Sequence, residues 1–291
     1  MMLMQPKRVV LIGALVGAAL LVVGLIAHLA AGRPPEDDPA SALMAAYEDA
    51  AAAGLGQAAE LDHGTDASAR AEVPVLMYHN ILPHRSGESA AQRRYSVEPD
   101  AFARQMAWLR ERGYEPVSLD QLAAHLRSGA PLPAKPVVLT FDDGWESQHR
   151  HALPVLDKFG FKAVFFVTTG YLDHRMFMSR AQVRELADRG MTVGAHTRTH
   201  PFLTRVSDAL LRDEVAGGKS ALEEILGRTV DDFAYPFGDL NGRVVAAVKA
   251  AGYLVARGTG SGKVQTKDRL FTLKCFEVHD SLDELGRYLG R

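Results

Sequence analysis

The sequence predicts an α/β fold in which helices surround a mostly parallel sheet. Between residues 73 and 291, short apolar segments alternate repeatedly with longer amphipathic ones. Several amphipathic segments stop at a glycine, as at Gly113, Gly129 and Gly160, which is typical of helix C-termini. Seven or eight such units fit a barrel, complete or incomplete, and they also fit an open doubly wound sheet.

Each element is expected from its local pattern. The first helix has Phe102, Met106 and Leu109 on one face, while Ser179 and Ser207 are N-cap residues of later helices. The expected strands are 75–78, 115–118, 136–140, 163–168, 191–195, 233–235, 253–256 and 271–278. The expected helices are 99–112, 119–127, 152–159, 179–189, 207–226, 243–251 and 282–289.

The first residues differ from the rest. Lys7 and Arg8 precede an apolar run, residues 9–31, that contains no Asp, Glu, Lys or Arg. As a helix this run is roughly 35 Å long, enough to cross a bilayer. A retained single-pass anchor over residues 1–32 is favoured over a cleaved signal peptide, whose apolar region is usually about 7–15 residues. The positive residues place the N-terminus in the cytoplasm and the remaining chain on the outer side.

Residues 33–72 are rich in alanine and proline and predict a tether without a chemical role, which leaves residues 73–291 as the functional domain. The chain has 33 Lys and Arg against 35 Asp and Glu, for a net charge of -2, and one cysteine. This balance argues against nucleic-acid binding, and a single cysteine excludes an intrachain disulfide scaffold.

Polar side chains stand at the end of five of the expected strands or directly after them. They are His79, the pair Asp142 and Asp143, the pair His196 and His200, Tyr235, and His279. Because parallel strands present their carboxyl ends at one edge, these residues are expected on one rim.

Asp143, His196 and His200 form a possible three-ligand metal site with open positions, the pattern of a catalytic zinc. Asp142 is then free to accept a proton from water. Pro236 fixes the backbone after Tyr235, so the Tyr235 N–H is a candidate oxyanion donor. Taken one at a time, these segments also fit an ordinary surface turn, two loop histidines and a strand-ending turn.

Three segments together resemble the first three motifs of the NodB-like polysaccharide deacetylases, carbohydrate esterase family four. The segments are 140–144 (TFDDG), 196–200 (HTRTH) and 235–238 (YPFG). The resemblance implies a distorted (β/α) barrel of about seven strands and metal-dependent removal of acetyl groups from N-acetylhexosamine. It makes Asp142 the base, the Tyr235 N–H the oxyanion donor, and Asp143, His196 and His200 the metal ligands. Zinc is the default metal, and Co, Ni, Mn or Fe also fill such sites.

Residues 73–81 (VPVLMYHNI) are similar to the opening of a subgroup, the poly-β-1,6-N-acetylglucosamine N-deacetylases. This similarity makes His79 the general acid, with His279 as the alternative from the ordinary family order. An arginine that holds the base in the family is replaced here by the stretch Phe233-Ala234, so the residue that orients Asp142 is left open. Trp145 is expected either to line a sugar subsite or to pack.

The expected function is N-deacetylation of an extracytoplasmic polysaccharide built from N-acetylglucosamine, beside the cytoplasmic membrane and with the polysaccharide export machinery as a partner. The alternatives are deacetylation of peptidoglycan or chitin-like oligomers, O-acetyl esterase activity on xylan-type chains, and a non-catalytic carbohydrate-binding homologue.

Overall fold

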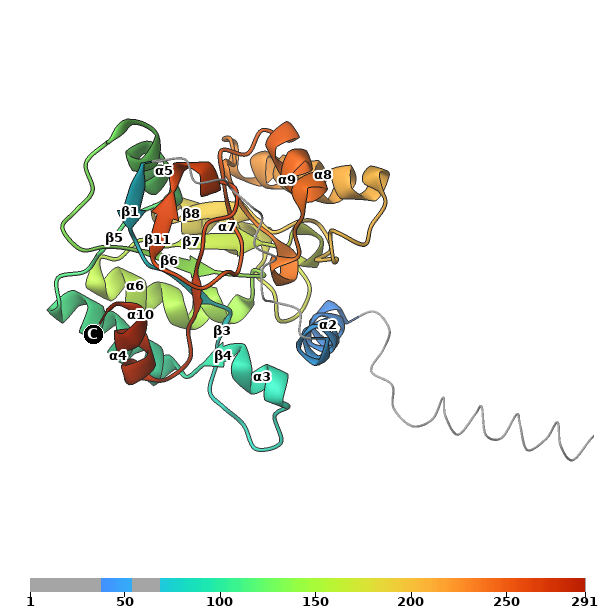
Figure 1. Ribbon diagram of the computed structural model, residues 1–291. Coiled ribbons are helices and arrows are strands. Elements are labelled where there is room, and N and C mark those ends of the chain that lie inside the picture. The colour runs from blue at the N-terminus through green and yellow to red at the C-terminus, as the bar shows by residue number, and fades with distance from the viewer. Residues whose placement is uncertain (1–37, 54–68, 291) are drawn as a thin grey trace, which may run out of the picture. The chain divides into compact units, whose positions relative to one another are not determined.

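A parallel sheet forms the centre of the molecule (Figure 1). The computed structural model describes residues 38–53 and 69–290, and the residues from Leu43 onward form one compact unit. The sheet of this unit has the order β10-β9-β8-β7-β6-β2-β12, and β5 pairs with β6 beside this path. Its strands are β2 (Val75–Tyr78), β5 (Glu115–Pro116), β6 (Pro136–Phe141), β7 (Val164–Val167), β8 (Thr192–Ala195), β9 (Asp232–Ala234), β10 (Val255–Arg257) and β12 (Phe276–Glu277).

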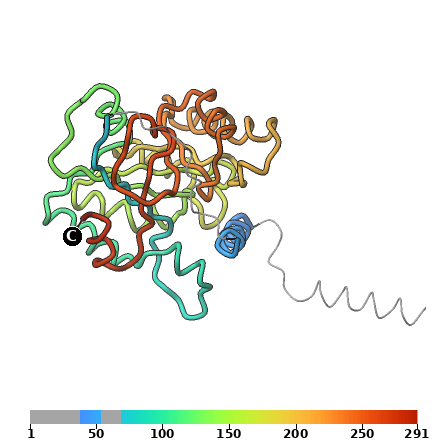
Figure 2. The backbone as a smooth tube through the Cα atoms, viewed as in Figure 1, coloured from blue at the N-terminus to red at the C-terminus, as the bar shows by residue number. Residues whose placement is uncertain are grey.

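The strand order is that of a barrel opened between β10 and β12. From β6 to β10 each new strand is added on the same side, without the reversal of direction that defines a doubly wound sheet. The last strand, β12, pairs with the first, β2, as in a barrel. Figure 2 shows the C-terminal segment returning beside the early part of the chain. The prediction of an α/β fold with a curled parallel sheet of seven strands is therefore confirmed.

Both faces of the sheet are buried, which explains why the strands are almost continuously apolar. Along β6, Val137 and Leu139 pack in one hydrophobic cluster, whereas Val138 packs in the other. Neighbouring side chains of a strand point to opposite faces, so each strand contributes to an outer core under the helices and an inner core inside the curl. Burying each such side chain contributes about 1.5–3 kcal/mol relative to exposure.

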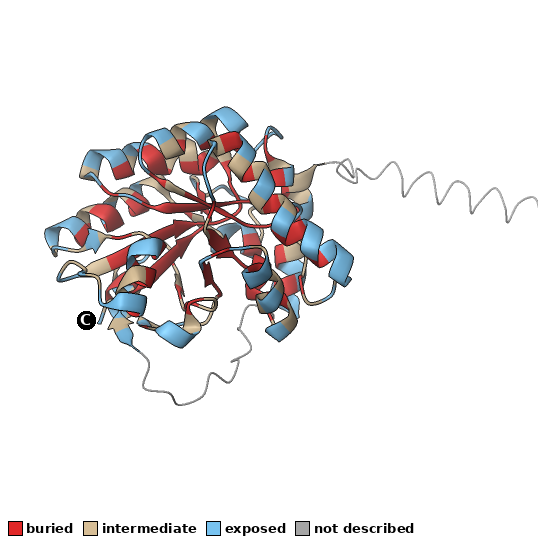
Figure 3. Cartoon of the chain, turned by 90° about the horizontal axis from the view of Figure 1, so that it is seen from above, coloured by how far each residue is buried: buried red, intermediate tan, exposed pale blue. Residues whose placement is uncertain are grey.

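Most helices cover the outer face, with their exposed residues turned away from the strands (Figure 3), whereas the buried leucines of α5 (Leu119–Ser128) pack in the same inner cluster as Val138. The helices are α3 (Ala90–Arg94), α4 (Pro99–Glu111), α5 (Leu119–Ser128), α6 (Leu153–Phe159), α7 (Arg180–Asp188), α8 (Asp208–Leu226), α9 (Gly242–Ala250) and α10 (Leu282–Tyr288). Ser118 and Ser179 form complete capping boxes, and Gly129 and Gly160 end their helices in the left-handed conformation.

The structure differs from the expectations in three segments. The stretch expected as a helix from residue 152 begins earlier, with a π-helical turn at Gln148–Ala152. The long strand expected at 271–278 is only β12, because Leu273 and Cys275 donate their backbone protons to Ala256 and Gly260, which turns this segment across the end of β10.

The third segment is the region expected to be a tether, which contains regular structure. Its described part holds helix α2 (Pro39–Ala52) and strand β1 (Arg70–Glu72), which pairs with β11 (Val264–Thr266). A further short pair of strands, outside this segment, joins β3 (Asn80–Ile81) and β4 (Ser96–Val97).

The expected anchor, residues 1–32, lies outside the described residues, and no helix within the described residues is long and apolar enough to span a bilayer.

Candidate active site

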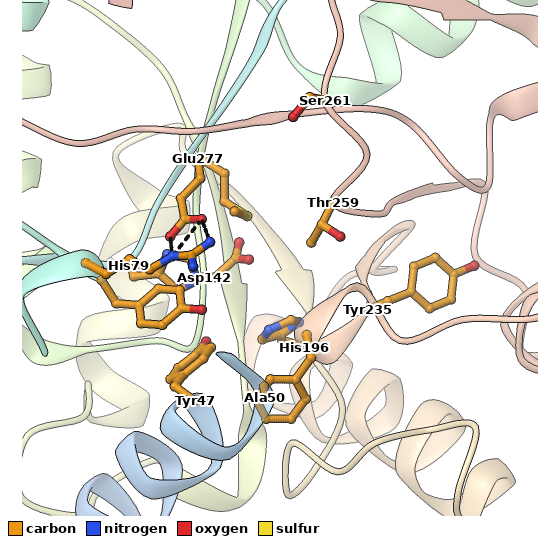
Figure 4. A pocket seen from close by; sticks show the side chains of 13 residues that line it. Tyr47, Ala50, His79, Asp142, His196, Tyr235, Thr259, Ser261 and Glu277 are labelled. Atoms are coloured by element: carbon orange, nitrogen blue, oxygen red, sulfur yellow. Dashed lines mark hydrogen bonds and ion pairs between the residues drawn. The ribbon is translucent and has the colours of Figure 1, made fainter. Parts of the chain in front are cut away.

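The sequence-predicted polar residues meet at the carboxyl edge of the sheet. Asp142 and Asp143 follow β6, His196 follows β8, and His79 follows β2. Asp142, His79, His196 and Tyr235 line one cavity of about 220 Å³ (Figure 4). The shared edge of parallel strands thus brings together residues that are more than 150 positions apart in the chain.

Asp143, His196 and His200 form a compact, buried cluster. The Asp143 Oδ1 atom lies 3.5 Å from His196 Nε2 and 3.3 Å from His200 Nε2, and the two Nε2 atoms are 3.1 Å apart. Within the described residues, this is the one group of His, Cys, Asp and Glu side chains close enough to hold a metal ion. Burial alone raises the pKa of Asp143, but the two imidazoles outweigh it and hold that pKa well below its usual value.

The donor set of this cluster fits a divalent cation. His196 Nδ1 lies 2.8 Å from the Ala234 carbonyl oxygen, an acceptor, so this nitrogen carries the proton and Nε2 offers its lone pair to the cluster. Asp143 and His200 both have positive φ, 77° and 58°, which turns their side chains inward from a tight backbone. One carboxylate and two imidazoles leave open positions, as catalytic zinc sites do.

Asp142 has a different partner. Its Oδ2 accepts a hydrogen bond from Arg257 Nη2, and Arg257 itself is completely buried. The other oxygen, Oδ1, is buried and has no hydrogen-bond partner among the described residues, and Asp142 is one of the residues that line the cavity. The arginine therefore fixes one side of the carboxylate and leaves the other side free to accept a proton.

Arg257 is the residue that orients Asp142, and the sequence did not single it out. It ends β10, the strand next to β9, and also donates to the Gly258 carbonyl at 2.9 Å. The available signal was a lone charged residue directly after an apolar strand segment, Leu254-Val255-Ala256.

The two candidate acids occupy different surroundings. His79 is 6% exposed and lines the cavity. His279 is not among the residues that line the cavity, and its Nδ1 lies 3.0 Å from Glu284 Oε2. The nearby Glu277 carboxylate raises the pKa of His279 despite its partial burial. Of the two histidines, His79 is the one placed to reach a group bound in the cavity.

The Tyr235 amide does not have the surroundings expected of an oxyanion donor. It donates to the Arg257 carbonyl oxygen at 3.2 Å, as part of the contact between β9 and β10. Two residues further on, Phe237 lines the same cavity and has a left-handed backbone, with φ of 57°. Its N–H follows Pro236 in the first turn of a short helix, where amide protons have no intrahelical acceptor.

Three further residues complete the site, and two of them, Glu277 and Tyr47, had no chemical role in the sequence-based prediction. Trp145 donates from Nε1 to Asp143 Oδ2 at 2.7 Å and stacks on Phe177, so it both packs and holds the aspartate. Glu277 lines the cavity and binds a guanidinium, that of Arg94, through both oxygens. Tyr47, from the segment expected to be a tether, also lines the cavity.

Comparison with known proteins agrees with this geometry. Residues 129–256 match the family described as polysaccharide deacetylase. YxkH of Bacillus subtilis, whose name describes it as a polysaccharide deacetylase, is 28% identical to this chain. The match covers 75% of this chain and 76% of YxkH. The poly-β-1,6-N-acetyl-D-glucosamine N-deacetylase of Escherichia coli K12 is 29% identical over 61% of this chain but only 32% of its own length.

A solved structure agrees over a similar range. IcaB from Ammonifex degensii has a TM-score of 0.67 and 27% identity, covering 76% of this chain and 97% of that chain. The chain thus spans most of YxkH and IcaB and about a third of the Escherichia coli enzyme. With the fold and the rim residues around it, the matched segment identifies a polysaccharide deacetylase domain in this chain, and polysaccharide deacetylases are hydrolases acting on carbon–nitrogen bonds other than peptide bonds.

Proposed function

We propose that this chain removes acetyl groups from N-acetylglucosamine units of poly-β-1,6-N-acetylglucosamine outside the cytoplasm. The observation that carries the proposal is the arrangement around the cavity, which is lined by His79, Asp142 and His196, the last of these a member of the Asp143–His196–His200 cluster. The linkage is supported by the names of the Escherichia coli and Staphylococcus aureus relatives, which are poly-β-1,6-N-acetyl-D-glucosamine N-deacetylases. The N-terminal apolar run, which precedes the described residues, supports a position at the outer face of the membrane.

Asp143, His196 and His200 would hold a divalent cation, with zinc as the default. When bound, such an ion supplies Lewis-acid polarisation of the acetyl carbonyl and makes nearby water more acidic. Trp145 holds the Asp143 oxygen that faces away from the imidazoles. The chain's contribution is therefore a fixed set of donors in a site from which most bulk water is excluded.

Different residues around the cation site carry out the separate proton transfers. Asp142 accepts a proton from water as the water oxygen forms a bond to the acetyl carbon. The Phe237 N–H, in place of the Tyr235 N–H, hydrogen-bonds the oxygen that becomes negative. His79, in its protonated form, donates its proton to the nitrogen as the carbon–nitrogen bond breaks, which leaves a free amine on the sugar and releases acetate.

The decisive test measures acetate and free amine after incubation with β-1,6-linked N-acetylglucosamine oligomers, chitin oligomers and peptidoglycan, each separately. We expect turnover of the β-1,6 oligomers, reduced about 10²–10⁴-fold in Asp142→Asn with bound metal retained. Asp283→Asn, at an exposed position on α10, is the matched control and should keep full activity. Faster turnover of chitin oligomers or peptidoglycan would make that glycan the substrate instead, and no turnover of any glycan would favour a binding role.

A further inference from the structure

Helix α2 places a tyrosine directly on the metal-ligand candidate Asp143. The Tyr47 hydroxyl donates to both carboxylate oxygens of Asp143, at 3.0 Å each. Tyr47 is only 3% exposed, although it comes from a segment that precedes the first strand of the barrel. A side chain from outside the barrel sequence thus reaches the centre of the site.

The Tyr47 ring lies between the groups that the reaction needs on either side of the substrate. Its centroid is 5.6 Å from the His79 ring and 5.7 Å from the His200 ring. It also packs on Tyr95, with ring centroids 4.1 Å apart, and on Phe237, with ring centroids 5.3 Å apart. The acetamide to be cleaved must reach both the candidate acid and the candidate metal ligands, and the tyrosine ring contacts a histidine of each kind.

The inward face of α2 is a short apolar stripe. Leu43, Tyr47 and Ala50 are buried at helical spacing, whereas Glu48 and Asp49 on the other side are exposed. Ala50 lines the same cavity as Tyr47. The stripe holds the helix in place through few side chains, an arrangement that a larger ligand can displace.

We propose that residues Leu43–Ala52 are a built-in occupant of the catalytic cavity, with Tyr47 in the position of the substrate acetamide. The helix must move away before a polysaccharide chain enters. This inference rests on the proposed function for the identity of the displaced ligand, but not for the contact itself. Since only the open fraction binds substrate, the apparent affinity of the full chain is lower than that of the open site by that fraction.

The first experiment uses the full chain with Asp142→Asn, so that substrate is bound without turnover. Adding a β-1,6-linked N-acetylglucosamine pentamer should increase amide hydrogen exchange in residues 43–52 as the helix is displaced. In a second variant that carries both Asp142→Asn and Tyr47→Ala, the pentamer should bind at least about tenfold more tightly. Tyr47→Phe, which keeps the ring and loses the hydroxyl, should act in the same direction more weakly, and Glu48→Gln should have no effect. Greater protection of residues 43–52, or weaker pentamer binding by the Tyr47 variants, would make α2 a wall of the substrate site and overturn the proposal.

The second experiment needs no substrate. Diethyl pyrocarbonate modifies accessible histidines, and mass spectrometry reports the rate at each one. Tyr47→Ala in the full chain should accelerate modification of His79 at least about tenfold, with the exposed His174 as an internal reference of unchanged rate. Equal rates at His79 in wild type and variant would refute the proposal. If His79 is accelerated while no variant binds the pentamer, the substrate assignment fails and the occupied cavity stands.

Discussion

Asp142 and Asp143 are adjacent in the sequence but have separate electrostatic environments. Asp142 forms an ion pair with the buried guanidinium of Arg257, whereas Asp143 faces two imidazoles and the Trp145 N–H. Two unpaired carboxylates on adjacent residues would repel each other, and one of them would keep its proton. Distinct partners let each carboxylate keep its own role.

Arg257 acts on the reaction through Asp142, so its replacement tests orientation rather than charge. In Arg257→Lys the ammonium keeps the positive charge but cannot reproduce the planar fork that reaches Asp142 and the Gly258 carbonyl together. We expect kcat to fall about 10²-fold with little change in KM, because a misplaced base affects the chemical step. Steady-state kinetics measure this, with the melting temperature showing that the fold is retained. An unchanged kcat would contradict the positioning role.

His79 and His279 can be separated by parallel substitutions. His79→Ala should lower kcat about 10²–10⁴-fold, since it removes the proton donor on the cavity wall. His279→Ala should leave kcat within about twofold, since its imidazole is engaged with Glu284 outside the cavity lining. Turnover rates on the same oligomer distinguish the two histidines, and the reverse pattern would transfer the acid role to His279.

At the scale of elements, the sequence predicted strands and helices well where one local signal dominated. Buried strands such as β6 have long apolar runs, and helices such as α5 have both a capping serine and a terminal glycine. It predicted poorly where pairing with distant segments decides the structure. The segment before β12 is apolar enough for a strand, but its backbone hydrogen bonds are made with residues on β10 and in the loop that follows β10. Arg257 and Tyr47 were missed for the same reason, since their partners are 115 and 96 positions away.

Strand β9 carries an uncompensated buried acid at the end opposite to the active site. Asp232 is 1% exposed, and neither carboxylate oxygen has a hydrogen-bond partner among the described residues. Burial raises its pKa well above the ordinary value, and Asp120 and Asp231 add to this effect. The folded state thus keeps a proton that the unfolded state releases above about pH 4, so this residue reduces stability progressively as the pH rises from there.

Asp232→Asn should therefore stabilise the protein, by about 1–3 kcal/mol at pH 7. The gain should shrink as the pH falls toward about 4 and should reach zero below it, where the aspartate is protonated in both the folded and the unfolded state. Thermal unfolding of both proteins between pH 4 and 8 measures the difference. Asp283→Asn, on the surface, is the matched control with no pH-dependent gain. A gain independent of pH would point to packing instead of protonation.

At the scale of the whole molecule, the candidate metal cluster joins two distant parts of the sheet. Asp143 follows β6 and His196 follows β8, so a bound cation would link strands that are not neighbours. A ligand that binds only the folded state stabilises it, by about 2.7 kcal/mol when free Zn²⁺ is a hundred times its Kd. For a domain of this size, that is a rise in melting temperature of about 5–10 °C.

Calorimetry of metal-free protein with and without added Zn²⁺ tests this link. His200→Ala should lose the rise, while His174→Ala, at an exposed position, should keep it. Equal melting temperatures of the wild type at both metal concentrations would argue against a cation at this cluster.

The alternation of strands and helices predicted a parallel sheet but fitted both a barrel and a doubly wound sheet, and the barrel came from the family resemblance. The rim residues followed from their places at the ends of strands. The opening between β10 and β12 did not, because it depends on how far the sheet curls, and curl is a sum of small twists that no single residue encodes.

The pairing of β12 with β2 has a consequence for how the protein is made. Strand β2 (Val75–Tyr78) leaves the ribosome long before β12 (Phe276–Glu277), the segment that covers its outer edge. During that interval an apolar strand with unsatisfied backbone groups is open to pairing with other nascent chains. Slow translation of the stretch between β2 and β12 should therefore increase aggregation more than slow translation of the stretch before β2, and a chaperone that shields β2 should act until Phe276 has emerged.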